Sequence, residues 1–153
     1  MARQNWKPGT MIYPLPAVLV SCGTSVDDSN LITVAWTGTI CTDPAMCYIS
    51  VRPSRYSYDI IKSTMEFTIN LTTESMARAT DWAGVKSGRE YDKWRETGLT
   101  PVKGVAVSCP YVGESPLSIE CRVKEIVRLG SHDMFIAEVL GILADERYID
   151  PAT

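Results

Sequence analysis

The chain has 153 residues and a mass of 16.9 kDa, the size of one domain, and 45% of its residues are hydrophobic, which is enough for a core. Its 15 basic and 18 acidic residues leave a net charge of −3, which argues against a chain-wide cationic surface for nucleic acid. No run approaches the roughly 20 apolar residues of a membrane span, and the N-terminus lacks the apolar core of a signal peptide. We therefore predict a single domain over residues 1–153, located in the cytoplasm, with neither nucleic acid nor a membrane as partner.

Seven short runs, mostly rich in Val, Ile and aromatic residues, predict strands. They are Ala17–Cys22, Leu31–Trp36, Met46–Arg52, Glu66–Leu71, Val105–Ser108, Leu117–Val127 and Asp133–Leu143. In the sixth run, apolar and polar residues alternate until Glu125 breaks the phase, which predicts a β-bulge and a bent strand. In the seventh, residues of both phases are apolar from Met134 to Leu143, so we expect both faces to be covered and predict a homodimer.

Three short helices are expected between the strands. They run from a cap at Ser54 or Ser57 to Thr64, from a cap at Thr73 towards Trp82, and from Glu90 to Thr97 before a left-handed cap at Gly98. Strands outnumber helices and the βαβ alternation of a parallel nucleotide-binding sheet is missing, which predicts a mainly β fold. The chain also has no G-x-G-x-x-G sequence and no P-loop, the two usual phosphate-binding loops.

The cysteine pattern excludes two classes of small stabilised domain. The five cysteines are Cys22, Cys41, Cys47, Cys109 and Cys121. Their number is odd and no two are spaced as C-x-x-C, which argues against a disulfide framework and against a zinc ribbon. Because four of them lie in or at the ends of apolar runs, we predict buried free thiols and no metal site.

A cluster of arginines and serines falls where a predicted strand meets a predicted helix start. Its members are Arg52, Ser54, Arg55 and Ser57. Guanidinium groups, hydroxyls and a helix N-terminus can together hold a dianionic phosphate, so the cluster predicts a phosphate-bearing ligand. The alternative is that the arginines are solvated, or form weak ion pairs with Asp43 and Asp59.

Several ordered sequence blocks together indicate a known family. They are residues 14–20 (PLPAVLV), 33–38 (TVAWTG), 51–57 (VRPSRYS), 66–71 (EFTINL), 84–89 (GVKSGR), 98–100 (GLT) and 130–133 (GSHD). With these blocks the chain resembles the flavin reductase-like proteins of the FMN-binding split-barrel group, and within them the flavoredoxin-like branch. The resemblance implies a six-stranded antiparallel Greek-key split β-barrel with short helices, dimeric, with FMN at the subunit interface.

The resemblance also implies roles for individual residues. The expected FMN contacts are Thr33, Val34, Ala35, Trp36 and Thr37 at the polar edge of the flavin ring, Arg52, Ser54, Arg55, Ser57, Lys86 and Ser87 at the phosphate, and Asn70 at the ribityl chain or ring. A turn-capping role for Asn70, a core position for Trp36 and a solvated Lys86 are the structural alternatives. His132, the only histidine, is a candidate for contacting a nicotinamide or substrate, or for donating a proton to the reduced ring; otherwise it is a surface turn residue.

The expected function is that of an FMN-dependent oxidoreductase, in which the cofactor carries the chemistry. Electrons would pass from NAD(P)H or a reduced protein through FMN to flavin, ferric iron or another acceptor. The alternative is an FMN-binding electron-transfer protein without a nicotinamide site, and a barrel without flavin is a third hypothesis. Family relatives often carry a cysteine where this chain has Ala83, and commonly continue beyond the equivalent of Asp150, which predicts no thiol chemistry at Ala83 and a more open site.

Overall fold

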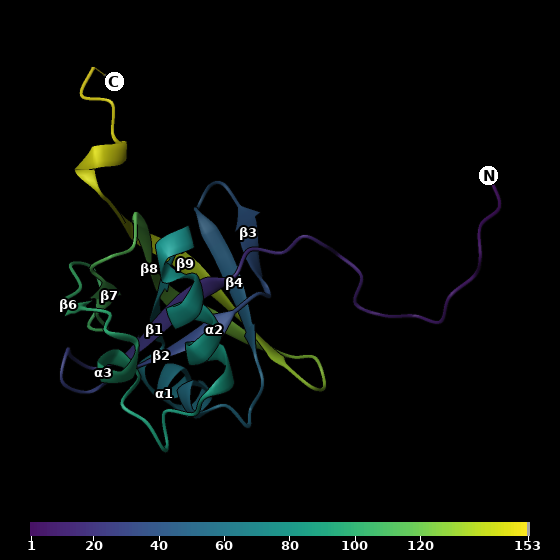
Figure 1. Ribbon diagram of the computed structural model, residues 1–153, viewed down its shortest axis with the longest axis horizontal. Helices are drawn as coiled ribbons and strands as arrows, with labels where there is room; N and C mark the ends of the chain where they lie inside the picture. The colour runs from purple at the N-terminus through teal and green to yellow at the C-terminus, as the bar shows by residue number, and fades with distance from the viewer. Residues whose placement is uncertain (153) are drawn as a thin grey trace.

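The computed structural model describes residues 1–152 and is mainly β, with three short α-helices in that range (Figure 1). Seven strands form one antiparallel sheet in the order β2-β1-β5-β8-β9-β4-β3. Their bounds are β1 Val18–Gly23, β2 Ser29–Val34, β3 Thr37–Cys41, β4 Met46–Val51, β5 Glu66–Asn70, β8 Leu117–Arg128 and β9 Asp133–Ala144. A separate pair is formed by β6 (Pro101–Val102) and β7 (Tyr111–Val112). None of the helices described has the length and apolar character needed to cross a bilayer.

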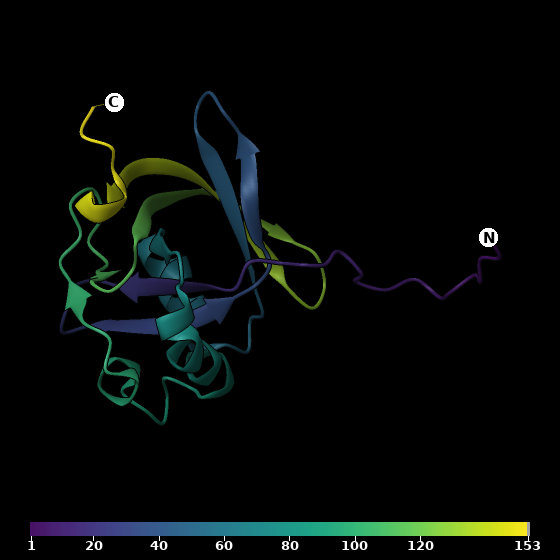
Figure 2. The same cartoon turned by 45° about the horizontal axis from the view of Figure 1, so that its top comes forward.

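The sheet closes into a barrel because its two edge strands are consecutive in the sequence. Strand β2 ends at Val34 and β3 begins at Thr37, so only Ala35 and Trp36 separate the two edges. The Ser50 amide in β4 donates to the Trp36 carbonyl at 2.9 Å and extends the β3–β4 ladder towards β2. Strands β2 and β3 therefore act as one bent strand, which confirms the predicted six-stranded split barrel (Figure 2).

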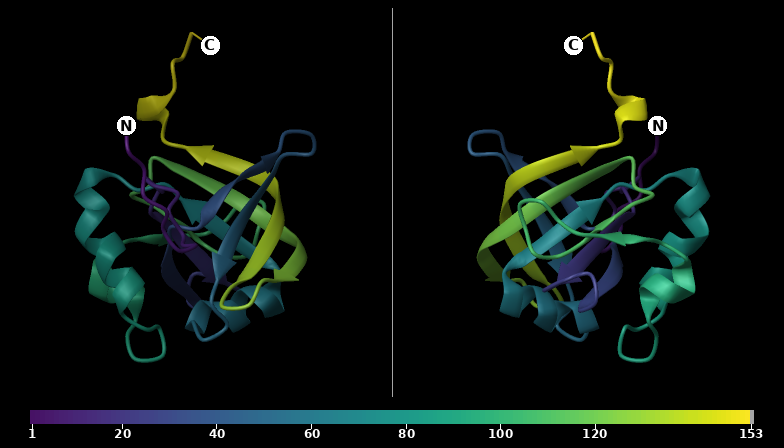
Figure 3. Two further views of the ribbon diagram at one scale, coloured as in Figure 1. Left: turned by 90° about the vertical axis from the view of Figure 1, so that its right-hand side faces the viewer. Right: turned by 90° about the vertical axis from the view of Figure 1, so that its left-hand side faces the viewer.

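The core fills the barrel, and helices cover part of its outside. Phe67, Ile49 and Phe135 are fully buried inside, where alternate residues of neighbouring strands meet. Helix α1 (Tyr56–Thr64) covers one end of the barrel, whereas α2 (Ala77–Val85) and α3 (Lys93–Thr97) lie along one side (Figure 3). These two helices form a second apolar cluster with Leu19 and Leu31, which point outward from β1 and β2.

The rest of the outer surface of the barrel is covered in one region and exposed in another. Residues 103–112 pack on the outer face of β5 and β8, where several side chains are polar. The outer face of β4 and β9 has no such cover within residues 1–152, and Tyr48, Met134 and Ile136 remain partly exposed there. Strands β4 and β9 thus leave one largely apolar surface of the barrel available to a partner.

Two register shifts bend the β8–β9 pair. One lies between Val123 and Glu125, which confirms the bulge predicted at Glu125. The other, at Glu120 and Cys121, was not predicted. It changes the phase of β9, so that Gly141 lies opposite Glu120 and the outer face no longer follows simple alternation.

Some predicted elements differ from the structure. Val105–Ser108 is not a strand, because side chains of the barrel take up its amide groups. Strand β3 was missed because its sequence, TGTIC, is short, contains glycine and is largely polar. Residues 74–76 form a 3₁₀ turn before α2, and the Thr73 hydroxyl does not cap it. A second 3₁₀ turn spans Glu146–Tyr148.

The helix termini are partly as predicted. Helix α1 begins after Arg55, and neither Ser54 nor Ser57 provides a side-chain cap. Helix α3 begins at Lys93 rather than Glu90, because the Asp92 carboxylate accepts from the amides at its first turn. Gly98 ends α3 with φ of 70°, as predicted.

The cysteines are all free, as the sequence predicts. Cys22, Cys47, Cys109 and Cys121 are buried, and Cys41 is partly exposed. Burial raises the pKa values of Cys22 and Cys109 to about 12, so both remain thiols at neutral pH. These two cysteines are therefore packing residues rather than nucleophiles.

Candidate functional site

The first part of the candidate site is a cavity at the N-terminus of α1. It has a volume of about 230 Å³ and lies between the α1 start, β2 and residues 86–88. The first amide groups of a helix have no partners within the helix and carry a partial positive charge, which favours an anion. Ser54 and Ser57 line the cavity, and Ser57 is held in place because its hydroxyl accepts from Asn30 Nδ2 at 2.7 Å.

Four basic side chains line this cavity and no acidic side chain does. They are Arg52, Arg55, Lys86 and Lys93. Among the described residues none of the four has a carboxylate within ion-pair distance, so the pairing of the arginines with Asp43 and Asp59 is not seen. An unbalanced group of cations at a helix N-terminus is an environment that an anion stabilises.

Lys93 is the most unusual of these cations because it is buried. Only 4% of the residue is exposed, and its Nζ donates to the Ala83 carbonyl at 2.6 Å. Burial, together with the nearby positive charge of Arg55, lowers the Lys93 pKa to about 8. An ammonium held in this position gains stability when an anion enters the cavity.

The loop of residues 86–89 forms one wall of the cavity at close range. At Gly88 an added Cβ would lie 2.3 Å from Asn30 Oδ1 and 2.6 Å from a ring carbon of Tyr56, so only glycine fits. Arg89 fixes the loop from the other side by donating to the Ser54 carbonyl at 3.1 Å, and its guanidinium lies 5.5 Å from the Tyr56 ring. The loop therefore holds Lys86 and Ser87 at the cavity.

The second part of the site is a groove of about 370 Å³ that adjoins the first. The two cavities share Ile32, Arg52 and Arg55 in their linings. The groove follows the end of β2 and the two-residue link to β3, and its other lining residues are Thr33, Val34, Ala35, Trp36, Ser50, Val51 and His132. A flat, amphipathic group fits beside such a strand end, where the backbone supplies polar groups and Trp36 an aromatic wall.

His132 reaches the groove from the turn between β8 and β9. Its ring centroid lies 4.2 Å from that of Trp36, and its Nε2 accepts from Arg52 Nε at 3.4 Å. Burial lowers the His132 pKa, and the charges of Arg52 and Arg55 lower it further. The imidazole is therefore predominantly neutral at pH 7, since the ordinary histidine pKa of 6.5 already lies below that pH.

The structure brings together ten of the predicted cofactor contacts together with His132 in the two cavities. Thr33 and Val34 present backbone only, because the Thr33 hydroxyl donates to the Thr80 carbonyl and Val34 packs in the core. Thr37 lies just outside the groove, and its hydroxyl donates to the Tyr48 carbonyl at 2.8 Å.

Asn70 lies away from both cavities. Its residue is completely buried and its amide is used internally: Nδ2 donates to the Leu19 carbonyl, and Oδ1 accepts from the Val112 amide and the Ser118 hydroxyl. These contacts give Asn70 a structural role, but they join neighbouring segments of the barrel rather than cap a turn. Asn70 is therefore not part of the candidate site.

Two central residues of the site, Asn30 and Lys93, were not predicted from the sequence. Asn30 precedes the apolar part of β2, and Lys93 was placed in an ordinary amphipathic helix. The Asp92 cap was the available signal for Lys93, because it sets the start of α3 and turns Lys93 and Trp94 inward. No pattern in the sequence identifies Asn30, which reaches the site only through the β1–β2 pairing.

The donor set fits FMN. The first cavity offers cations, hydroxyls and a helix N-terminus to a dianionic phosphate, and the Gly88 contact shows that its wall is closely built. The adjoining groove offers strand backbone, Trp36 and a neutral imidazole to a planar ring. The phosphate cavity and the ring groove share lining residues and therefore adjoin each other. A ligand whose phosphate is linked to a planar ring requires such an arrangement.

Solved structures with this fold include two flavoredoxins. The flavoredoxin of Desulfovibrio vulgaris (Miyazaki F) is 33% identical and superimposes with a TM-score of 0.89 over 99% of this chain and 81% of that one. The flavoredoxin of Methanosarcina acetivorans is 25% identical, with a TM-score of 0.89 over 98% and 79%. An NADH:riboflavin 5'-phosphate oxidoreductase of Streptomyces pristinaespiralis is 25% identical over 72% of this chain and 57% of its own length. Residues 10–152 match the family described as Flavin reductase like domain, and the chain therefore belongs to the flavin reductase-like family.

Proposed function

We propose that the protein binds FMN and acts as an oxidoreductase that passes electrons through this cofactor. The observation that carries the proposal is the group of four cations without a carboxylate at the N-terminus of α1, next to a groove that accepts a planar ring. When bound, FMN supplies one- and two-electron redox chemistry. The similarity to an enzyme named for riboflavin 5'-phosphate, which is FMN, supports this choice of cofactor.

In this proposal the residues of the chain bind and orient rather than react. Arg52, Arg55, Lys86 and Lys93 neutralise the phosphate, and Ser54, Ser57 and Ser87 donate hydrogen bonds to it. Backbone groups from Thr33 to Trp36 face the polar edge of the ring. Neutral His132, held between Trp36 and Arg52, is placed to contact a substrate or to hold a proton near the ring.

The electron donor separates two versions of the function. In the first, NADH or NADPH reduces the bound flavin, as the name of the Streptomyces relative states for that protein with NADH. In the second, a reduced protein is the donor and the chain is an electron carrier without a nicotinamide site, which the likeness to two flavoredoxins favours. The groove itself is compatible with either donor.

Steady-state oxidation of NADH and NADPH distinguishes these versions. The purified protein is supplied with FMN, and the absorbance of the nicotinamide is followed with free flavin or ferric iron as acceptor. Turnover with either nucleotide supports the enzyme. A flavin-loaded protein that neither nucleotide reduces, but that dithionite reduces and ferric iron reoxidises, supports the carrier; a protein that takes up no FMN overturns both.

We further propose that the protein is a homodimer, because the outer face of β4 and β9 leaves Tyr48, Met134 and Ile136 partly exposed within residues 1–152, with the Lys124–Glu138 ion pair beside them. This is the surface for which the sequence predicts a partner. A single domain and a cytoplasmic location stay predictions from the sequence.

A further inference from the structure

The first 14 residues form an arm that runs away from the barrel. All of them are exposed, and the arm projects from the body in the views of Figures 1 and 2. The arm nevertheless carries large apolar side chains. Trp6 is 75% exposed, Met11 66%, Ile12 80% and Tyr13 71%. Four such groups on one short segment are costly to leave in water, which indicates that the arm has a binding surface elsewhere.

An apolar notch lies where the arm leaves the barrel. It has a volume of about 480 Å³, and residues 9–12 with Leu15 form one side of it. The other side is formed by Tyr48 and Ser50 of β4, Met134 of β9, Leu129 of the turn between β8 and β9, and Trp36. The notch is thus large enough for an aromatic side chain and is continuous with the surface proposed as the dimer interface.

Charge favours a second copy of this chain as the occupant of the notch. The arm contains Arg3 and Lys7 and no acidic residue, so residues 1–14 carry +2. Since the whole chain carries −3, the remaining residues carry −5. The net charges of the arm and of the body of another copy are therefore opposite, and the notch itself is lined only by uncharged side chains, which suit an aromatic group. Because the arm and the notch belong to the same region of one chain, a two-fold axis allows each copy to give its arm and receive the other.

We propose that the arm of one copy crosses to a second copy and that Trp6 fills the notch of that copy. The inference rests on the proposed homodimer and adds the segment that links the two copies. Trp36 and Ser50 line both the notch and the groove proposed for the flavin ring. The arm of the partner subunit thus closes one end of that groove, and each site is complete only in the dimer.

Photo-crosslinking of the full chain tests the path of the arm. The photoreactive residue p-benzoylphenylalanine takes the place of Trp6, and the irradiated protein is analysed by denaturing electrophoresis and peptide mass mapping. We expect a product of twice the chain mass, linked to the peptide that contains Trp36, Leu129 or Met134. A product linked within one chain, or a chain that remains uncrosslinked or monomeric, overturns the proposal. The control places the same residue at Val105, which is similarly exposed at 78% but lies over β5 and β8, and should give no double-mass product.

A matched pair of substitutions tests the contribution of Trp6 to the dimer and to the FMN site. Trp6→Ser should raise the dissociation constants of the dimer and of FMN about tenfold or more. Trp6→Phe keeps an aromatic group, so both of its dissociation constants should stay close to those of the unmodified protein. Equal behaviour of all three proteins overturns the proposal. Cross-linking between copies without any FMN binding refutes the proposed function but not the exchange of the arm between copies. Normal FMN binding with an intrachain crosslink refutes the exchange of the arm but not the proposed function.

Discussion

At the scale of residues, the site is defined by charges that lack partners. A lysine is rarely buried without a counter-ion, because removing its charge from water is costly. Lys93 is nevertheless buried in a cavity that also holds Arg52 and Arg55, and within residues 1–152 its ammonium donates to a carbonyl rather than to a carboxylate. Such a group of neighbouring positive charges costs free energy in the protein alone, and a bound phosphate dianion offsets this cost. We infer that it exists for the ligand rather than for stability.

The lowered pKa of Lys93 predicts a pH dependence of FMN binding. Below pH 8 the ammonium is charged and attracts the phosphate; above pH 8 the ligand-free protein loses this proton, so the dissociation constant of FMN should rise between pH 7 and pH 9. The phosphate itself is already ionised in this range, since its second pKa is about 6. Fluorescence quenching titrations at several pH values measure the effect.

The control for this prediction is Lys93→Met, which keeps the length of the side chain and removes the charge. It should bind FMN more weakly at pH 7 and show little change up to pH 9. Riboflavin, which has no phosphate, should show little change with either protein. A Lys93→Met variant with the full pH dependence of the unmodified protein would assign the titration to another group.

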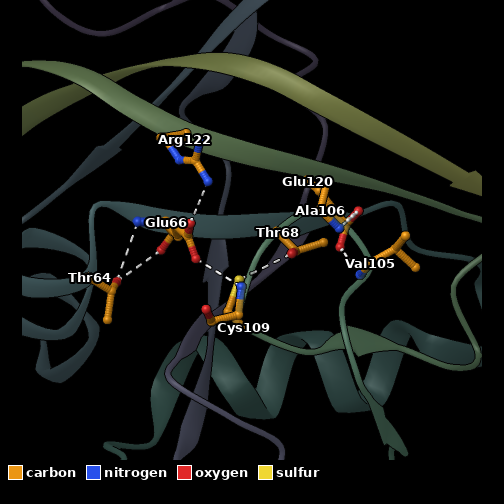
Figure 4. Close-up of polar contacts among 9 residues, drawn as sticks. Thr64, Glu66, Thr68, Val105, Ala106, Cys109, Glu120 and Arg122 are labelled. Atoms are coloured by element: carbon orange, nitrogen blue, oxygen red, sulfur yellow. Dashed lines mark hydrogen bonds and ion pairs between the residues drawn. The ribbon is translucent and has the colours of Figure 1, made fainter.

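At the scale of elements, a row of side chains on the barrel holds the segment of residues 103–112 in place. Glu120 accepts from the amides of Val105 and Ala106 at 2.7 and 2.9 Å, and Glu66 accepts from the Ser108 amide at 2.8 Å (Figure 4). Further along the same face, Asn70 accepts from the Val112 amide. The segment is therefore an irregular cover whose amides bind side chains instead of another strand.

Glu120→Gln should loosen this cover. Hydrogen bonds to charged groups contribute about 1.5–3 kcal/mol each, and the substitution removes the charge at a residue that is only 1% exposed, so we expect the free energy of unfolding to fall by about 1–3 kcal/mol. Urea denaturation measures the loss, and amide hydrogen exchange should accelerate at Val105 and Ala106. Glu125→Gln, on the exposed part of the same strand, should change neither, and equal losses in both variants would mean that the Glu120 contacts do not hold the segment.

These contacts explain why some elements could be predicted from the sequence and others could not. Strands with clear alternation, such as β8 with its bulge at Glu125, were predictable from local pattern. The segment Val105–Ser108 was not, because its hydrogen bonds come from residues distant in the sequence. In the site, Arg52 and Arg55 could be predicted from their place before a helix, whereas Asn30 and Lys93 reach the cavity only through tertiary packing.

At the scale of the whole molecule, the barrel is covered by helices on one side and by residues 103–112 on another, whereas over β4 and β9 only residues 9–15 of the described chain lie near part of the face. The Tyr48 and Ile136 residues lie opposite each other in this register and are both partly exposed. Because this face adjoins the groove proposed for the flavin ring, assembly and cofactor binding are expected to depend on one another. The proposed homodimer and the proposed site are therefore tested together.

Ile136→Asp should separate the two copies. A charge in the middle of the apolar face is costly to bury, so the variant should be monomeric at micromolar concentration and should bind FMN more weakly. Sedimentation equilibrium gives the mass, and a urea titration shows that the variant is folded. Lys62→Asp, on α1 at the end of the barrel, serves as the control and should leave the mass of the dimer unchanged. A dimeric Ile136→Asp protein would place the interface elsewhere.

The comparison of FMN with riboflavin tests the central claim most directly, because the two ligands differ only in the phosphate. We predict that the unmodified protein binds FMN at least a hundredfold more tightly than riboflavin, since several charge-assisted hydrogen bonds of about 1.5–3 kcal/mol each depend on that group. Arg55→Ala should narrow the difference, and Arg78→Ala, on the exposed side of α2, should leave it unchanged. Equal affinities for the two ligands, or no binding of FMN in a fluorescence titration, would contradict the assignment of the cationic cavity as a flavin phosphate site.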